Sequence, residues 1–191
     1  MANEPLDTYF LDRALVFAVK AHSGTERRGK GFPYIVHPLE AVTIVATMTS
    51  DQELLAAAAL HDTVEDTAVT VDEIRDAFGD RVASLVEKES DCPVDGVPEK
   101  DSWHYRKQAA IDRLREAPLD AKIVALGDKL SNMRSIARDY QEMGDELWNI
   151  FHVTDRGEHE WHYRGLADAL RELSGTAAFK EFEQLINQVF A

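Results

Sequence analysis

The run ALHDTVEDT (residues 59–67) places one histidine and three carboxylates within six residues: His61, Asp62, Glu65 and Asp66. On one helix, or on a helix and its end, these positions are i, i+1, i+4 and i+5 and share one side. Like charges at that spacing repel one another, so a positive charge is expected among them. An imidazole nitrogen with carboxylate oxygens suits Mn²⁺, Fe²⁺ or Zn²⁺, whereas Ca²⁺ prefers oxygen ligands alone. The alternative is a solvated acidic helix end in which the histidine is incidental.

A second segment, RRGKGFPYIVHP (residues 27–38), places His37 at the start of an expected helix, after a basic and glycine-rich loop. Arg27, Arg28 and Lys30 form the most basic cluster of an acidic chain. A guanidinium can both stack on a purine and donate hydrogen bonds to phosphate, so this loop is a candidate binding site for a nucleotide. A solvated loop without a ligand is the alternative.

A third segment, KIVALGDKLSNMRS (residues 122–135), places Asp128 among apolar residues of another expected helix. A buried carboxylate there would need a partner. Asp128, Asn132 and Ser135 fall at i, i+4 and i+7, which gives the helix one polar stripe. The alternative is that Asp128 is exposed, because Lys129 beside it must also reach solvent.

Helical periodicity predicts the elements that position these residues, and strand signals are scarce. Asp51 is the expected N-cap of the helix that leads to the HD pair, and Thr70 with Glu73 forms an expected capping box before a stop at Gly79. The segment 90–101, with three breakers, is the expected loop. The expected helices are residues 11–22, 37–48, 51–62, 70–79, 107–116, 119–140, 158–173 and 176–190. These signals predict one all-α domain.

Composition limits the classes of function. The net charge of −14 argues against non-specific binding of nucleic acid, although local basic residues or a metal still allow a small anionic ligand. No apolar run is long enough for a transmembrane helix, and the N-terminal residues do not resemble a signal peptide. Cys92 is the only cysteine, so an internal disulfide is excluded and a cytoplasmic location is expected.

The three segments together follow the order H…HD…D and resemble the HD-domain metal-dependent phosphohydrolases. They are most similar to the hydrolase domain of the bifunctional alarmone synthetase/hydrolases and to the small stand-alone alarmone hydrolases. The similarity covers residues 14–138 of 191. It implies a single compact HD-domain fold over residues 1–191, with C-terminal helices in 139–191. The family usually has alanine where Gly127 stands, and its segment between the second and third motifs differs from PVDGVPEKDSWHYRK.

The resemblance also implies roles for individual residues. It implies one Mn²⁺ per chain, or another divalent transition metal, held by four ligands: His37, His61, Asp62 and Asp128. It implies that Glu65 and Asp66 are the catalytic pair that handles the attacking water. It implies substrate contacts from Arg28, which packs on the base, and from Asn132 and Ser135 near the base and ribose. Arg27 and Lys129 are further candidate substrate contacts, because their positive charges suit phosphates.

The implied reaction is hydrolysis of the 3′-pyrophosphate of ppGpp or pppGpp, the alarmones of the stringent response, to GDP or GTP and pyrophosphate. A bound Mn²⁺ can lower the pKa of its water and offset the charge that develops during phosphoryl transfer. Two alternatives remain: a phosphohydrolase that acts on another nucleotide such as NADPH, and a silent domain that only binds nucleotide. The oligomeric state is open. Retention of all four metal ligands and of the acidic pair disfavours the silent domain.

Overall fold

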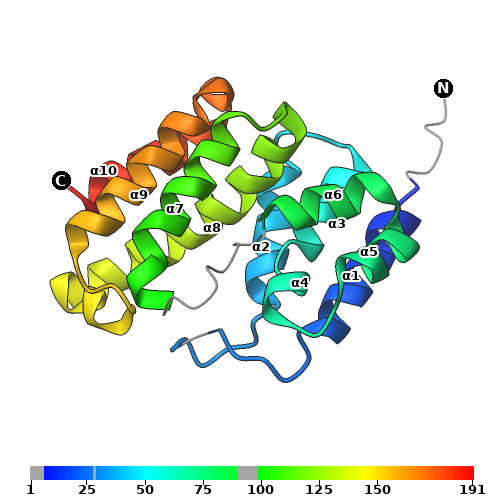
Figure 1. Cartoon of the computed structure of the whole chain (residues 1–191), viewed down its shortest axis with the longest axis horizontal. Coiled ribbons are helices and arrows are strands. Elements are labelled where there is room, and N and C mark those ends of the chain that lie inside the picture. Colours follow the sequence, from blue (N-terminus) through cyan, green and yellow to red (C-terminus); the bar gives the residue numbers. More distant parts are fainter. Residues whose placement is uncertain (1–6, 28, 90–98) are drawn as a thin grey trace. The chain divides into compact units, whose positions relative to one another are not determined.

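Helices are the regular secondary structure of the residues that the computed structural model of the protein describes, which are 7–27, 29–89 and 99–191 (Figure 1). Within these ranges the only β-type pairing is an isolated bridge between Glu26 and Pro33. The all-α prediction is therefore confirmed. None of the described helices is long and apolar enough to cross a membrane.

The chain forms two compact units, Met1–Ser90 and Asp91–Ala191. The assignment of residues 1–191 to one domain stays a prediction. The first unit contains α1 (Tyr9–Ala21), α2 (Val36–Val45), α3 (Gln52–Leu60), α4 (Thr63–Asp66), α5 (Val71–Phe78) and α6 (Asp80–Glu89).

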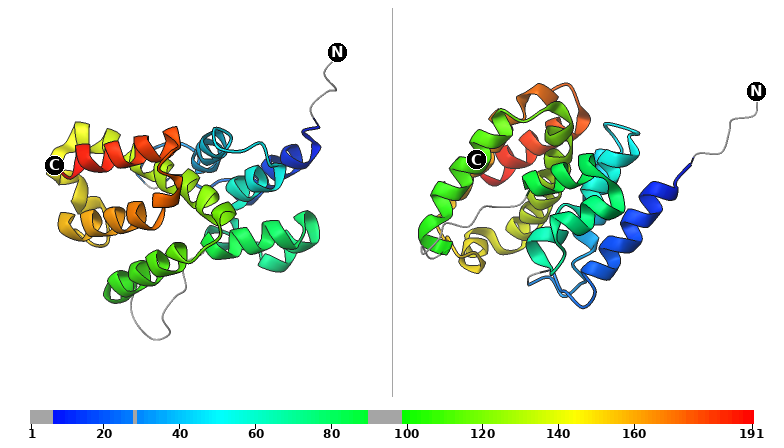
Figure 2. Two further views of the ribbon diagram at one scale, coloured as in Figure 1. Left: turned by 90° about the horizontal axis from the view of Figure 1, so that it is seen from above. Right: turned by 45° about the vertical axis from the view of Figure 1, so that its right-hand side comes forward.

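Helix α3 is the centre of the first unit, because α1, α2 and α6 all pack against it (Figures 1 and 2). Residues 54–60 of α3 are buried, and four of them are consecutive alanines (56–59). Small side chains allow neighbouring helices to approach closely, while the leucines at both ends fill the space between them. The helix that leads to the HD pair is thus surrounded on several sides.

The capping signals in this unit are confirmed. The Asp51 side chain accepts a hydrogen bond from the Glu53 N–H at 2.9 Å. Thr70 and Glu73 form the reciprocal capping box of α5, and Gly79 ends that helix with a φ of +89°, a conformation that favours glycine. Helix α6 begins directly after Gly79 and was not among the predicted elements. No loop separates it from α5, so no loop signal in the sequence marks the start of a second helix there.

The second unit contains α7 (Glu99–Arg115), α8 (Leu119–Met143), the 3₁₀ segment η1 (Gly144–Ile150), α9 (Arg156–Ala169), the short η2 (Arg171–Leu173) and α10 (Ala177–Val189). Helix α8 packs against α10, and α7 packs against α9. In Figure 2 the red α10 lies along the yellow-green α8. Helix α7 begins at Glu99 and not at the predicted Lys107, so residues 99–101 of the predicted loop are helical. The rest of that loop, 90–98, lies outside the described residues.

Aromatic side chains pack against one another in the second unit. Trp148 stacks on His159 with ring centroids 5.1 Å apart and on Phe190 at 5.5 Å. The His159 Nε2 lies 2.7 Å from the carbonyl oxygen of Val153. His104 stacks on Trp161 at 3.9 Å. These histidines pack within the second unit.

The N-cap of α3 is testable, because it starts the helix that carries His61 at its end. Asp51→Ala removes the acceptor for the Glu53 N–H and the 2.8 Å ion pair with Arg81. We expect a loss of about 1 to 2 kcal/mol in the free energy of unfolding at pH 7, measured by urea denaturation. Asp51→Asn keeps a capping oxygen and should recover most of the loss. Equal losses in both variants would mean that the ion pair, and not the cap, is the stabilising contact.

Candidate functional site

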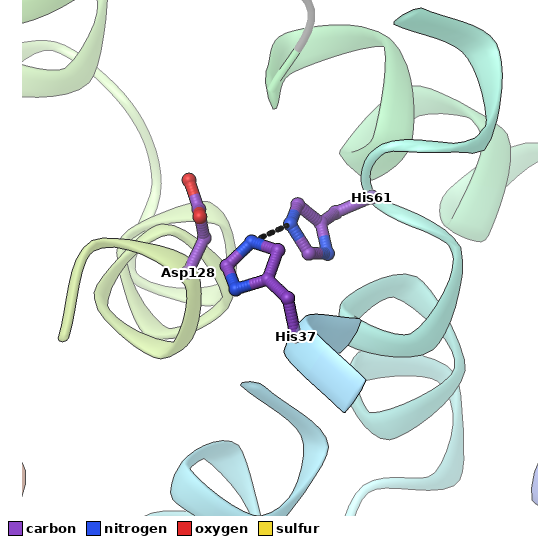
Figure 3. Close-up of side chains that lie close together, drawn as sticks. All are labelled: His37, His61 and Asp128. Atoms are coloured by element: carbon purple, nitrogen blue, oxygen red, sulfur yellow. Dashed lines mark hydrogen bonds between the residues drawn. The ribbon is translucent and has the colours of Figure 1, made fainter. Parts of the chain in front are cut away.

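Three predicted ligand side chains converge in the first unit. The Nε2 atoms of His37 and His61 are 3.2 Å apart, as the dashed line in Figure 3 shows. The Asp62 Oδ2 lies 3.3 Å from the His37 Nε2 and 2.9 Å from the His61 Nε2. Both imidazoles are buried, and the Asp62 side chain is 17% exposed. A carboxylate oxygen can bind a cation, and so can an imidazole nitrogen that carries no proton.

The positions of these side chains follow from local structure. His37 lies in the first turn of α2, where its N–H donates to the carbonyl of Tyr34 at 2.9 Å. Helix α3 ends at Leu60, whose carbonyl accepts a hydrogen bond from the Thr63 hydroxyl at 2.7 Å. His61 and Asp62 therefore occupy the turn between α3 and α4. The acidic run is therefore not one continuous helix: α3 ends before His61, and Glu65 and Asp66 lie on a second, short helix.

The orientation of His61 determines which ring nitrogen is available to a metal. The Nδ1 lies 2.8 Å from the carbonyl oxygen of Ala58, which can only accept a hydrogen bond. The proton of a neutral His61 therefore lies on Nδ1, and Nε2 presents its lone pair to His37 and Asp62. A ring N–H held by a backbone carbonyl is the usual way in which proteins fix a metal-binding histidine.

Tyr34 is a neighbour of Asp62 that the sequence did not single out. Its hydroxyl donates to the Asp62 Oδ2 at 2.7 Å. Burial raises the pKa of the Tyr34 phenol far above its usual value, and the carboxylates of Asp62 and Asp66 raise the pKa further. The phenol is therefore a hydrogen-bond donor over the whole working range of pH.

Glu65 and Asp66 lie on the short α4, and both are exposed. The Asp66 N–H donates to the Asp62 carbonyl at 2.9 Å, so one helical turn separates the two carboxylates. The predicted catalytic pair thus starts one turn beyond a predicted metal ligand and is open to solvent.

The basic loop before His37 folds back on itself. The Tyr34 N–H donates to the Thr25 carbonyl at 2.8 Å, and the Arg27 N–H donates to the Phe32 carbonyl at 2.9 Å. The Arg27 guanidinium lies over the Tyr34 ring, 5.2 Å from its centroid. Arg28, the predicted base-stacking residue, lies outside the described residues.

His22 is a second residue near the site that the sequence did not reveal. It is 3% exposed at the end of α1, and its ring lies 4.8 Å from that of Tyr34. Neither of its ring nitrogens has a hydrogen-bond partner among the described residues. Burial lowers the pKa of His22, and the charges of Asp62 and Asp66 oppose this effect. A histidine within an apolar helix carries no sequence signal for such a position.

Asp128 lies in the second unit, on α8. It is buried, which excludes the exposed position that was the alternative for this residue. The Lys129 ammonium donates to its Oδ2, and the Asn132 amide donates to its Oδ1, each at 2.5 Å. Two predicted substrate residues therefore hold the Asp128 carboxylate. Ser135, the third on this helix, is half-buried.

The cluster of His37, His61 and Asp62 fits a divalent transition metal. Two imidazole nitrogens and a carboxylate oxygen are the donor types that Mn²⁺, Fe²⁺ and Zn²⁺ accept, and the three atoms lie within 3.3 Å of one another. The tautomer of His61 and the Tyr34 hydroxyl at Asp62 supply the second layer of hydrogen bonds that such sites use.

Comparison with known proteins supports this interpretation of the cluster. The HD domain family model matches residues 14–153. A guanosine-3′,5′-bis(diphosphate) 3′-pyrophosphohydrolase of Aquifex aeolicus is 35% identical over 136 residues, which cover 71% of this chain and 19% of that protein. The bifunctional (p)ppGpp synthase/hydrolase SpoT of Escherichia coli is 34% identical over 149 residues, which cover 70% of this chain and 20% of SpoT. The chain thus spans about a fifth of the length of these relatives.

Two solved structures share the fold. One, described as a metazoan ortholog of SpoT that hydrolyses ppGpp, has a TM-score of 0.73 and 22% identity and covers 97% of this chain and 98% of that chain. The other, lmo0812 of Listeria monocytogenes, has a TM-score of 0.70 and 29% identity, with 84% of this chain and 97% of that chain covered.

The environment of His22 gives a pH-dependent prediction. Its folded pKa is lowered, so the unfolded chain binds the proton more tightly and stability is lost as pH falls below about 6.5. His22→Phe keeps a ring beside Tyr34 and removes this proton. In metal-free buffer between pH 7.5 and 5.5, we expect the unfolding free energy of the variant to fall less steeply, by at most about 1.4 kcal/mol per pH unit. Parallel curves from urea denaturation would contradict the prediction.

Proposed function

We propose, since this chain belongs to the HD-domain family, that it is a metal-dependent hydrolase that removes the 3′-pyrophosphate of ppGpp and pppGpp. The observation that carries the proposal is the convergence of the His37, His61 and Asp62 donor atoms within 3.3 Å. The names of the relatives from Aquifex aeolicus and Escherichia coli supply the substrate class.

The proposed metal set adds Asp128 to these three residues. Two neutral imidazoles and two carboxylates would balance the charge of one divalent ion, and Mn²⁺ is the ion that we propose. The buried Asp128 carboxylate is oriented by hydrogen bonds from Lys129 and Asn132, which supports a role as an ordered ligand. A bound divalent ion supplies two effects at such a site: a lower pKa for a bound water, and charge that offsets the phosphoryl oxygens.

Glu65 and Asp66 are the proposed catalytic pair. They are exposed, and the backbone bond between Asp66 and Asp62 places them one turn from a proposed ligand. One ionised carboxylate accepts the proton of the attacking water, and the other orients that water. The water oxygen bonds to the phosphorus that is attached to the 3′ oxygen, the bond between that phosphorus and the 3′ oxygen breaks, and the 3′ oxygen takes up a proton. Pyrophosphate therefore leaves intact.

The proposed substrate contacts come from two places. Arg27 presents a half-buried guanidinium from the basic loop, which suits a purine face or a phosphate. On α8, Lys129, Asn132 and Ser135 are half-buried and lie within the two helical turns that follow Asp128. The role of Arg28 at the base stays a prediction.

The substrate and the metal can be tested together. We expect metal-free protein to bind about one Mn²⁺ per chain, and the loaded protein to convert ppGpp to GDP and intact pyrophosphate. Products from a panel of guanosine and nicotinamide phosphates would be separated by ion exchange. Chelation followed by gel filtration should abolish turnover, and Mn²⁺ should restore it.

Three results would contradict the proposal. Turnover that survives chelation would exclude the metal mechanism. Release of single orthophosphates from ppGpp would exclude attack at the 3′ position. A clear preference for NADPH over ppGpp would favour a phosphohydrolase for another nucleotide.

The catalytic pair gives a second prediction. Glu65→Gln and Asp66→Asn keep size and hydrogen bonding but remove basicity, so kcat should fall by about 10²- to 10⁴-fold while Mn²⁺ affinity is retained. Calorimetry of Mn²⁺ binding and steady-state kinetics measure the two quantities. Matched controls are Glu87→Gln and Asp76→Asn, which change exposed acids on α6 and α5. Loss of metal together with activity would make Glu65 and Asp66 ligands.

A further inference from the structure

We propose that Tyr34 is a positioning residue that holds the Asp62 carboxylate in the orientation that binds metal. The inference rests on the proposed function and assigns one residue of the same site. Tyr34 lies in the loop between α1 and α2, and its hydroxyl reaches a carboxylate 28 residues further along the chain.

The geometry of the contact indicates that the Tyr34 hydroxyl supports metal binding by Asp62 and does not compete with it. The Tyr34 hydroxyl donates at 2.7 Å to the Asp62 Oδ2, the same oxygen that faces the Nε2 atoms of His37 and His61. A carboxylate oxygen has two lone pairs, so one can accept the phenol hydrogen while the other is directed at a cation. A hydrogen bond to one lone pair therefore fixes the direction of the second.

The Tyr34 ring is itself held from several directions. It contacts the ring of His22, with centroids 4.8 Å apart, and meets the ring of His37 edge-on at 5.9 Å. The guanidinium of Arg27 lies over the ring, 5.2 Å from its centroid. The backbone of Tyr34 donates to Thr25 and accepts from His37. A ring with these contacts has little freedom to turn its hydroxyl away from Asp62.

The contact also connects the basic loop with the metal site. Arg27, a proposed substrate residue, touches one part of the Tyr34 side chain, and the Asp62 carboxylate touches the other. The loop conformation that presents Arg27 is therefore the one that places the phenol at Asp62.

The test is Tyr34→Phe, which removes the hydroxyl and keeps the ring. Isothermal titration of metal-free protein with Mn²⁺ should show an increase in Kd of about 10- to 100-fold, the usual effect of losing an outer hydrogen bond to a metal ligand. Excess Mn²⁺ should then restore most of kcat, with KM for ppGpp nearly unchanged. A role in substrate binding or in proton transfer would give neither the weaker Kd nor the rescue.

Tyr140→Phe is the matched control. Its hydroxyl also donates to a carboxylate, that of Asp145 at 3.4 Å, but it lies on α8 in the second unit and has no proposed role in the reaction. This variant should bind Mn²⁺ with the wild-type Kd. An unchanged Kd in Tyr34→Phe would overturn the proposal. Loss of the folded state in metal-free Tyr34→Phe alone would overturn it too, because the residue would then be structural.

The hydrogen bond can be isolated without metal. In a double-mutant cycle on metal-free protein, Tyr34→Phe should lower Tm in the wild-type background and change it much less in Asp62→Ala. Equal shifts would mean that the phenol acts through another group. If the wild-type protein hydrolyses ppGpp but Tyr34→Phe binds Mn²⁺ with the wild-type Kd, this inference fails and the proposed function stands. Wild-type protein that binds no Mn²⁺ refutes both.

Discussion

The close approach of two imidazoles and a carboxylate is the interaction on which the candidate site of the first unit depends. The nitrogens of His37 and His61 and an oxygen of Asp62 meet within 3.3 Å, and both imidazoles are buried. Three such atoms repel one another unless a proton or a cation lies between them. The surrounding contacts, from the Ala58 carbonyl to the Tyr34 hydroxyl, hold the three side chains in place.

The packing around α3 holds these three side chains close together. The helix is buried along residues 54–60, and α1, α2 and α6 pack against it, so the position of its last turn is fixed from several sides. The chain turns after Leu60, and this turn brings the side chains of the consecutive residues His61 and Asp62 to one point. His37 arrives from α2, which packs on the same helix. The site is therefore an outcome of helix packing as much as of sequence motif.

Local signals in the sequence predict helix caps well and tertiary contacts poorly. Asp51 caps α3 as predicted, because an N-cap depends only on neighbouring residues. Helix α7 begins earlier than predicted, because its first eight residues, EKDSWHYR, have few apolar side chains to mark a buried face. Tyr34 and His22 were missed at the site, since their importance comes from residues distant in sequence. The metal ligands His37, His61, Asp62 and Asp128 remain a proposal.

The turn from Asp62 to Asp66 has a consequence for how this protein can evolve. Each residue of a helix advances the side-chain direction by about 100°, so one inserted or deleted residue between the two carboxylates would swing the second away from the first. A substitution at an intervening position leaves this spacing intact, whereas a change of length removes the shared geometry altogether. Variation in length therefore belongs in the connections between helices and not in this short turn.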